Sequence, residues 1–128
     1  NWGKYVQKYL DSVGIHFPAA WCMAFNYWCI NEASKIHAQK NPLFKSGGVL
    51  NTWNMTDKSR RVKTPKPGDV FIIDFGKGLG HAGIVTSVKG NFIYTIEGNT
   101  NDDGSREGYE VAARRRPIAN IKGFINID

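Results

Sequence analysis

Three residues far apart in the chain have the side chains that a thiol-dependent hydrolase requires: Cys22, His81 and Glu97. A thiol attacks a carbonyl carbon effectively only as the thiolate, so it needs a base that takes its proton. An imidazole can be that base, and a third polar group must then fix its tautomer and orientation. If the fold brings the three together, they could perform hydrolysis by acyl transfer to sulfur.

Cys22 lies in the apolar segment 18–30, which we expect to form a buried helix. Pro18 suits a first helical turn, because its φ is already helical and its missing N–H would be unpaired there anyway. Cys22 would then also fall in the first turn, where free N–H groups and the helix dipole favour a thiolate. This placement makes Cys22 a candidate nucleophile. The alternative is a small buried hydrophobic residue, the usual role of a lone cysteine in an apolar helix.

A second cysteine, Cys29, follows seven positions later. On one helix the two cysteines would lie about 10 Å apart along the axis. A disulfide requires Cα atoms within about 7 Å, so both thiols should be free. We interpret Cys29 as a buried hydrophobic residue.

His81 and Glu97 stand at opposite ends of two predicted strands, 81–88 and 92–97, which a tight turn at 89–91 joins. Antiparallel pairing places the start of the first strand beside the end of the second. Glu97 and Asn99 should therefore lie close to His81. The alternatives are a hydrogen-bonded surface histidine and a carboxylate that ends an edge strand.

The order of the elements predicts an α+β fold in one domain spanning residues 1–128, a length sufficient for a hydrophobic core. Helical spacing of apolar residues over 2–13, closed by Gly14, predicts a first helix. The buried helix should continue to about Ile36, with a short third helix over 49–53. After a turn at 65–69, strands are predicted at 70–74, 81–88, 92–97, 111–115 and 121–127, an antiparallel sheet of about five strands.

The chain carries 17 basic and 11 acidic side chains, a formal charge of +6, and five of the basic residues fall within 58–66. Such a cluster attracts polyanions such as nucleic acid, anionic lipid or a bacterial wall, or it is only a solvated surface. A non-catalytic basic module that binds cell wall or nucleic acid therefore remains the alternative to an enzyme. No apolar run approaches the roughly 20 residues of a membrane span. Because the sequence opens on Asn1, we expect that upstream residues have been removed.

Four motifs together resemble the CHAP domain, the cysteine, histidine-dependent amidohydrolases/peptidases of the papain-like superfamily. They are Trp-Cys-Met-Ala-Phe at 21–25, Pro-Gly-Asp-Val at 67–70, Gly-His-Ala-Gly-Ile-Val at 80–85 and Ile-Glu-Gly-Asn-Thr at 96–100. They occur in order and cover nearly the whole chain. The resemblance implies a papain-like fold and, as substrate, the peptide part of bacterial peptidoglycan.

The resemblance also implies the roles of the site residues. Cys22 would be the nucleophile, His81 the general base and acid, and Glu97 the residue that orients His81. Asn99 would support the site or share the role of Glu97. The backbone N–H of Cys22, unpaired at the helix start, is the expected oxyanion donor.

Two tryptophans, Trp21 and Trp53, could line the substrate cleft or pack in the core. We expect a monomer without cofactor that acts outside the cytoplasm, extracellular or periplasmic, and that does not bind nucleic acid. An inhibitory or immunity protein stays open as a partner. The sequence leaves open which amide bond is cleaved. It also leaves open whether the protein is a phage lysin, a remodelling enzyme or a toxin.

The segment from Asn99 to Glu110 matches the spacing of a calcium loop of the EF-hand kind. Its first position is Asn instead of Asp, and its flanks are predicted strands instead of helices. The three histidines are scattered, and the two cysteines share one helix, which gives no zinc pattern. We therefore expect no bound metal.

Overall fold

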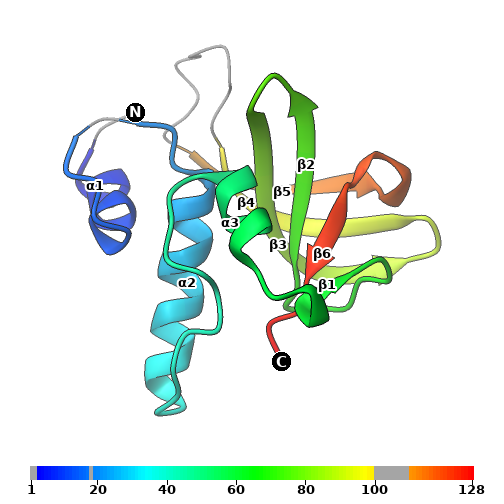
Figure 1. Cartoon of the computed structure of the whole chain (residues 1–128), viewed down its shortest axis with the longest axis horizontal. Helices are drawn as coiled ribbons and strands as arrows, with labels where there is room; N and C mark the ends of the chain where they lie inside the picture. The colour runs from blue at the N-terminus through cyan, green and yellow to red at the C-terminus, as the bar shows by residue number, and fades with distance from the viewer. Residues whose placement is uncertain (1–2, 18, 100–109) are drawn as a thin grey trace.

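The computed structural model describes residues 3–17, 19–99 and 110–128. In the described part of the chain, three α-helices precede the strands, which gives the predicted α+β arrangement (Figure 1). The helices are α1 (Lys4–Ser12), α2 (Cys22–Ile36) and α3 (Val49–Met55). The strands are β1 (Arg61–Val62), β2 (Val70–Gly76), β3 (Leu79–Lys89), β4 (Phe92–Asn99), β5 (Glu110–Pro117) and β6 (Gly123–Ile125), with 3₁₀ turns at Lys58–Arg60 and Ile118–Asn120.

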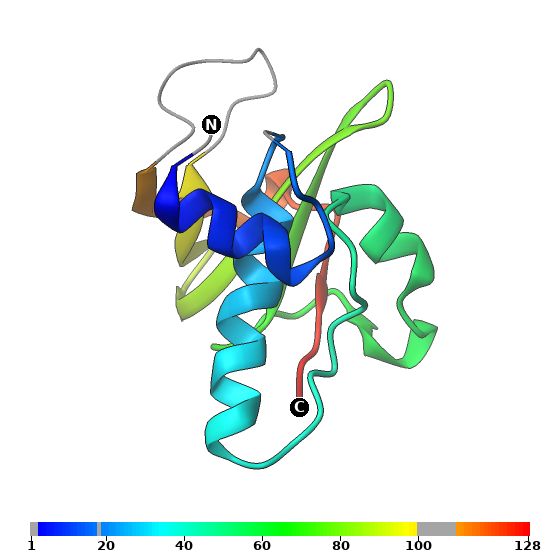
Figure 2. The same cartoon turned by 90° about the vertical axis from the view of Figure 1, so that its left-hand side faces the viewer.

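The strands form one curled antiparallel sheet in the order β1-β6-β2-β3-β4-β5. Helix α2 stands beside the sheet against β3 and β4, and α3 packs on β2 and β3. Helix α1 lies across α2 on the side away from the sheet (Figures 1 and 2). The N-terminal helices thus cover the sheet that the C-terminal half of the chain builds.

Helix α1 is amphipathic, as its spacing predicted. Val6 and Leu10 are buried and pack against the start of α2. Gly14 adopts φ +82°, a left-handed conformation that suits glycine at a helix end, and its N–H bonds to the carbonyl of Asp11. The predicted stop is therefore confirmed.

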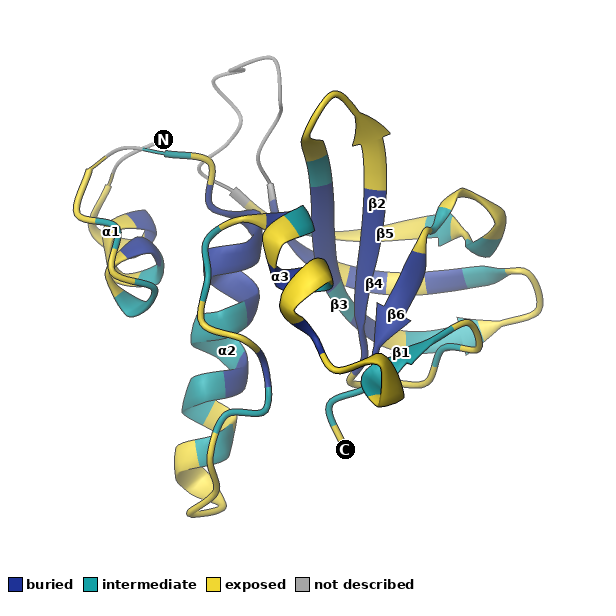
Figure 3. Ribbon diagram, in the orientation of Figure 1, coloured by how far each residue is buried: buried dark blue, intermediate teal, exposed yellow. Residues whose placement is uncertain are grey.

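Helix α2 begins at Cys22, four residues later than the segment expected from Pro18, and Pro18 lies outside the described residues. Trp21 is the N-cap, and the N–H of Phe25 bonds to its carbonyl. The Trp21 side chain is buried, and its backbone is not helical (φ −130°, ψ 13°). Helical geometry therefore starts at the next residue, Cys22. The helix ends at Ile36, as predicted. Only its start is buried on all sides, because residues 31–36 are partly or fully exposed (Figure 3).

The five predicted strands all form, most of them longer than expected. Only Lys77 and Gly78 lie between β2 and β3, both at positive φ. A sixth strand, β1, had not been predicted. It contains only two residues of the basic segment, too few for an alternating pattern, and it forms by pairing with β6.

The sheet separates two hydrophobic clusters, because successive side chains of a strand point to opposite faces. Val70 and Ile72 of β2 join the cluster under α2 and α3, whereas Phe71 and Ile73 join the cluster on the other face, around which the sheet curls. Figure 3 shows the central strands buried along most of their length. The sheet, packed on both faces, carries the site described next.

None of the helices within the described ranges is both long and apolar enough to cross a membrane.

Candidate active site

The cysteine at the start of α2 meets the histidine of β3. Cys22 is the first residue of α2 and is 5% exposed, and His81 is 7% exposed. The imidazole lies within reach of the thiol, and the interaction with Cys22 raises the pKa of His81. A nucleophile and a base within hydrogen-bond reach are the first requirement of thiol catalysis.

Glu97 occupies the other side of the imidazole. Nε2 of His81 lies 2.7 Å from Oε1 of Glu97, a carboxylate that is only 1% exposed. The β3–β4 hairpin brings the two residues together, so the predicted proximity is confirmed.

Gly83 makes this approach sterically feasible. A Cβ at Gly83 would lie 2.7 Å from Cγ of Glu97 and 2.5 Å from Cε2 of Phe71. Contacts below 3.0 Å essentially never occur for real Cβ atoms, so any larger residue would push the carboxylate or the Phe71 ring aside.

Two further side chains bind the same carboxylate. Thr95 donates from Oγ1 to Oε2 of Glu97 at 2.6 Å. Arg116 donates from Nε to Oε2 at 2.6 Å and from Nη2 to Oε1 at 2.7 Å. Arg114 stands farther away, with its Nε 3.8 Å from Oε1.

Arg116 was not singled out in the sequence analysis, because a run of three arginines at 114–116 has the composition of a basic surface. Side chains alternate along a strand, so a continuous arginine run in β5 must send its members to both faces. Arg115 stacks over the ring of Phe92, whereas Arg116 bonds to the buried carboxylate. The available signal was this run, on a strand that could pair with the strand of Glu97.

The protonation behaviour of the cluster follows from these contacts. Burial alone would lower the pKa of His81, but the hydrogen bonds and negative charges of Cys22 and Glu97 outweigh it and raise the pKa to about 9. Burial alone would raise the pKa of Glu97, but Arg116, His81 and Thr95 lower it to about 2. Glu97 is therefore ionised at neutral pH and can only accept hydrogen bonds, so Nε2 of His81 carries a proton.

The remaining predicted site residues lie elsewhere or outside the description. Trp21 is fully buried and stacks on Tyr9 with ring centroids 5.6 Å apart, so these contacts support packing and leave no accessible surface to line a cleft. Trp53 is half-buried on α3 and packs against Gly123 of β6. Asn99 ends β4, but its side chain is outside the description, and its support of the site stays a prediction.

The basic segment 58–66 binds largely to the protein itself. Nη1 of Arg60 bonds to the backbone carbonyls of Asn126 and Ile127, and Nη2 of Arg61 bonds to that of Asn54. Lys63 and Lys66 are likewise engaged, with the Lys122 carbonyl and the Asp128 carboxylate. These contacts weaken the polyanion-binding interpretation of this cluster.

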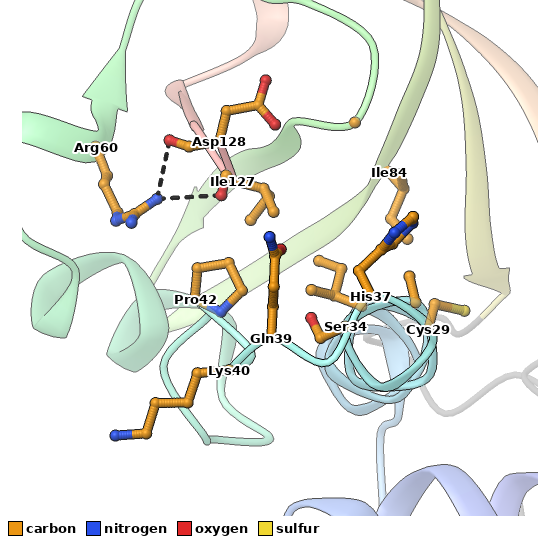
Figure 4. Close-up of a pocket in the computed structure, with 13 residues that line it drawn as sticks. Cys29, Ser34, His37, Gln39, Lys40, Pro42, Arg60, Ile84, Ile127 and Asp128 are labelled. Carbon is orange, nitrogen blue, oxygen red and sulfur yellow. Dashed lines mark hydrogen bonds between the residues drawn. The ribbon is translucent and has the colours of Figure 1, made fainter.

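A cavity of about 730 Å³ lies at the opposite half of α2 (Figure 4). Cys29, Ser34 and His37 line it from the helix, and Arg60 and Asp128 line it from the other wall. Burial first, and the Glu32 carboxylate second, raise the pKa of the Cys29 thiol to about 11. This second thiol is therefore protonated at neutral pH.

Among the described residues, no group of three or more metal-ligating side chains could hold an ion. Most of the calcium-like segment, residues 100–109, lies outside the described ranges. Its expected lack of calcium stays a prediction.

The fold and the site define an α+β protein with a thiol beside an imidazole that is hydrogen-bonded to a carboxylate. The CHAP domain family profile matches residues 14–99, well over half of the sequence. The chain belongs to the CHAP domain family, whose members are peptidoglycan-related amidases and peptidases.

A solved structure described as "The crystal structure of Ly7917" has the same fold, with a TM-score of 0.54 and 13% sequence identity. The similarity covers 83% of this chain and 53% of that protein, so the chain spans about half its length. No curated protein matches the chain.

Proposed function

We propose that this chain hydrolyses an amide bond in the peptide part of bacterial peptidoglycan, with Cys22 as nucleophile, His81 as general base and acid, and Glu97 as the orienting carboxylate. The proposal rests on the buried cluster of these three side chains at the start of α2, in which His81 bonds to Glu97 at 2.7 Å and interacts with Cys22. Membership of the CHAP family supplies the substrate class. The substrate also implies a site of action outside the cytoplasm.

The first half of the reaction forms a thioester. The thiol proton moves to His81, and the sulfur of Cys22 attacks the amide carbon, so that a C–S bond forms and the carbonyl electrons move onto oxygen. No cap side chain bonds the start of α2, so the N–H of Cys22 can donate to this oxyanion. The electrons then return, the C–N bond breaks, and His81 delivers its proton to the leaving amine.

The second half regenerates the thiol. His81 takes a proton from water, the resulting hydroxide adds to the thioester carbon, and the C–S bond breaks. The proton on His81 returns to the sulfur, and the acid is released. Throughout, Glu97 stabilises the imidazolium and keeps its ring in one orientation.

Digestion of purified peptidoglycan tests the proposal. The wild-type protein should release fragments with new amine and carboxyl termini, and mass spectrometry of these fragments identifies the cleaved bond. Cys22→Ala should abolish release while the protein remains folded by circular dichroism. Cys29→Ser is the matched control and should digest as the wild type does. Undiminished digestion by Cys22→Ala would refute the assignment of the nucleophile.

A further inference from the structure

We propose that Arg116 is a positioning residue of this site: by a two-pronged hydrogen bond it keeps Glu97 ionised and fixed, and thereby keeps the proton of the imidazole on Nε2. This inference rests on the proposed function for its kinetic readout. Arg116 does not touch the reacting sulfur, so its effect must act through Glu97 and His81.

The geometry leaves the carboxylate no freedom. Oε1 of Glu97 is bonded by Nε2 of His81 and Nη2 of Arg116, and Oε2 is bonded by Nε of Arg116 and Oγ1 of Thr95. A carboxylate offers about four lone-pair directions, and these four donors use them all. The parallel pair from one guanidinium also fixes the plane of the carboxylate, which a lysine could not do.

Charge is the second part of the argument. A carboxylate that is 1% exposed would take up a proton if no cation compensated its burial. Arg116 is first among the groups that lower the pKa of Glu97. The guanidinium is itself held in place, since it lies over the ring of Phe71 at 5.4 Å, and the same ring packs edge-on against His81 at 6.0 Å.

Protonation of Glu97 would reverse the hydrogen bond to the imidazole. A neutral carboxyl could donate to Nε2, and the imidazole proton would then have to reside on Nδ1. Because Nδ1 is the nitrogen left for Cys22, a proton there would prevent it from accepting the thiol proton. Arg116 therefore keeps the neutral ring in the tautomer that can act as a base, so that the second proton, which His81 holds below about pH 9, is taken up on Nδ1, towards Cys22.

The test compares Arg116→Met, Arg116→Lys and the control Arg115→Met, all in a Cys29→Ser background. Arg115 is adjacent in sequence but stacks on Phe92, so its removal changes the charge and leaves the carboxylate contacts in place. Two readouts are taken as a function of pH: the rate of Cys22 alkylation by iodoacetamide, and kcat and KM for peptidoglycan fragments.

The charged and titratable groups that face Glu97 are His81 from β3, Arg114 and Arg116 from β5 and, through His81, Cys22 from α2. With Arg116 in place, Glu97 stays ionised down to about pH 2. In Arg116→Met the pKa of Glu97 should rise, so the acid limb of both readouts should move to higher pH.

We expect Arg116→Met to lower kcat about 10- to 100-fold, as for residues that orient the ligands of metal sites, with KM changed less than about twofold. Arg116→Lys should keep the acid limb near its original pH but restore only part of kcat, because it supplies charge without the paired geometry. Arg115→Met should match the background in both readouts.

A folded Arg116→Met with unchanged kcat and acid limb would overturn the inference. If Arg116→Met does not fold, Arg116→Lys decides: a reduced kcat with an unshifted acid limb supports the inference, and an unchanged kcat overturns it. Alkylation needs no substrate, so a protein that digests no peptidoglycan but shows the shifted alkylation profile refutes the proposed function and retains the role of Arg116.

Discussion

The two ends of helix α2 carry the same residue types in different surroundings. At its start, Cys22 is buried against His81, which in turn bonds to Glu97. In its second half, Cys29 lies midway along the helix and His37 follows its last residue; both line a cavity, and neither is bonded to a buried ionised side chain among the described residues (Figure 4). The fully buried Trp21 and Met23 flank the first thiol, whereas the second thiol is only partly buried.

The difference shows that a cysteine and a histidine on one element do not make a thiolate site. The start of α2 differs in the charged side chains around it. The Arg116 guanidinium compensates the buried Glu97 carboxylate, and this carboxylate stabilises the protonated His81 imidazole. At the far end burial acts on the thiol without compensation, and the neighbouring Glu32 adds to the effect.

Thiol alkylation should separate the two ends most strongly. With its pKa at about 11, Cys29 is a thiolate in only about one molecule in 10⁴ at pH 7. Iodoacetamide at pH 7 should therefore modify Cys22 well before Cys29, as peptide mapping by mass spectrometry would show. Equal modification of both cysteines in the folded protein would remove the distinction.

Replacing each of the two histidines in turn should give the next largest difference, measured as the loss of kcat. His81→Gln removes the proposed base and should lower kcat by about 10²- to 10⁴-fold, the usual contribution of general acid–base catalysis. His37→Gln at the far end is the matched control and should leave kcat within about twofold. Digestion rates of purified peptidoglycan measure both, and a comparable loss in the two variants would contradict the comparison.

The pH dependence of stability should sharpen the comparison further. The folded-state pKa of Glu97, about 2, lies below its ordinary value of 4.5, so its stabilising contribution is complete above pH 4.5 and is lost as the pH falls towards 2. The folded-state pKa of His81, about 9, lies above 6.5, so its contribution is complete below pH 6.5 and is lost as the pH rises through 9.

Thermal unfolding should accordingly show Tm falling on both sides of the range 4.5–6.5. Glu97→Gln should lower Tm within this range and flatten the acid side. The matched control is Glu32→Gln, which removes an exposed carboxylate that is paired with Lys35 at the other end of α2. It should keep the slope of the wild type. A Glu97→Gln variant with the wild-type slope would mean that other carboxylates cause the acid loss.

The smallest expected effect is on stability, from filling the space at Gly83 next to the Glu97 side chain. Gly83→Ala should destabilise the protein by about 1–3 kcal/mol, since the added methyl overpacks the contact of Glu97 with Phe71. Gly3→Ala, at a position with no atom within 4 Å of the added Cβ, should change stability by no more than about 0.5 kcal/mol. Denaturant unfolding measures both, and equal effects would show that the space at Gly83 is not needed.

The sequence was sufficient for the features that depend on local pattern. The strand limits around 81–97 and the tight turn between them placed Glu97 beside His81 without any tertiary information. The apolar run placed Cys22 at a helix start, and the four motifs led to the family that the profile match shows.

The rest depended on pairing between distant segments. Arg116 reaches Glu97 only because β5 adds to the edge of β4, a neighbour relation that no periodicity of residues 110–117 reveals. The later start of α2 depends on how Trp21 packs with α1, and β1 exists only because β6 lies beside it. Local patterns identified the three residues in series but not the cation that completes them.

The uncapped start of α2 has a final consequence. Serine, threonine or aspartate in place of Trp21 would satisfy one of the first N–H groups of the helix, a gain of about 1 kcal/mol for an ordinary helix. The same side-chain oxygen would compete with an incoming carbonyl for those donors, and an aspartate would also repel a sulfur anion one residue away. The start of α2 thus lacks a side-chain hydrogen-bond acceptor at the place where, in the proposed reaction, the substrate carbonyl would supply one.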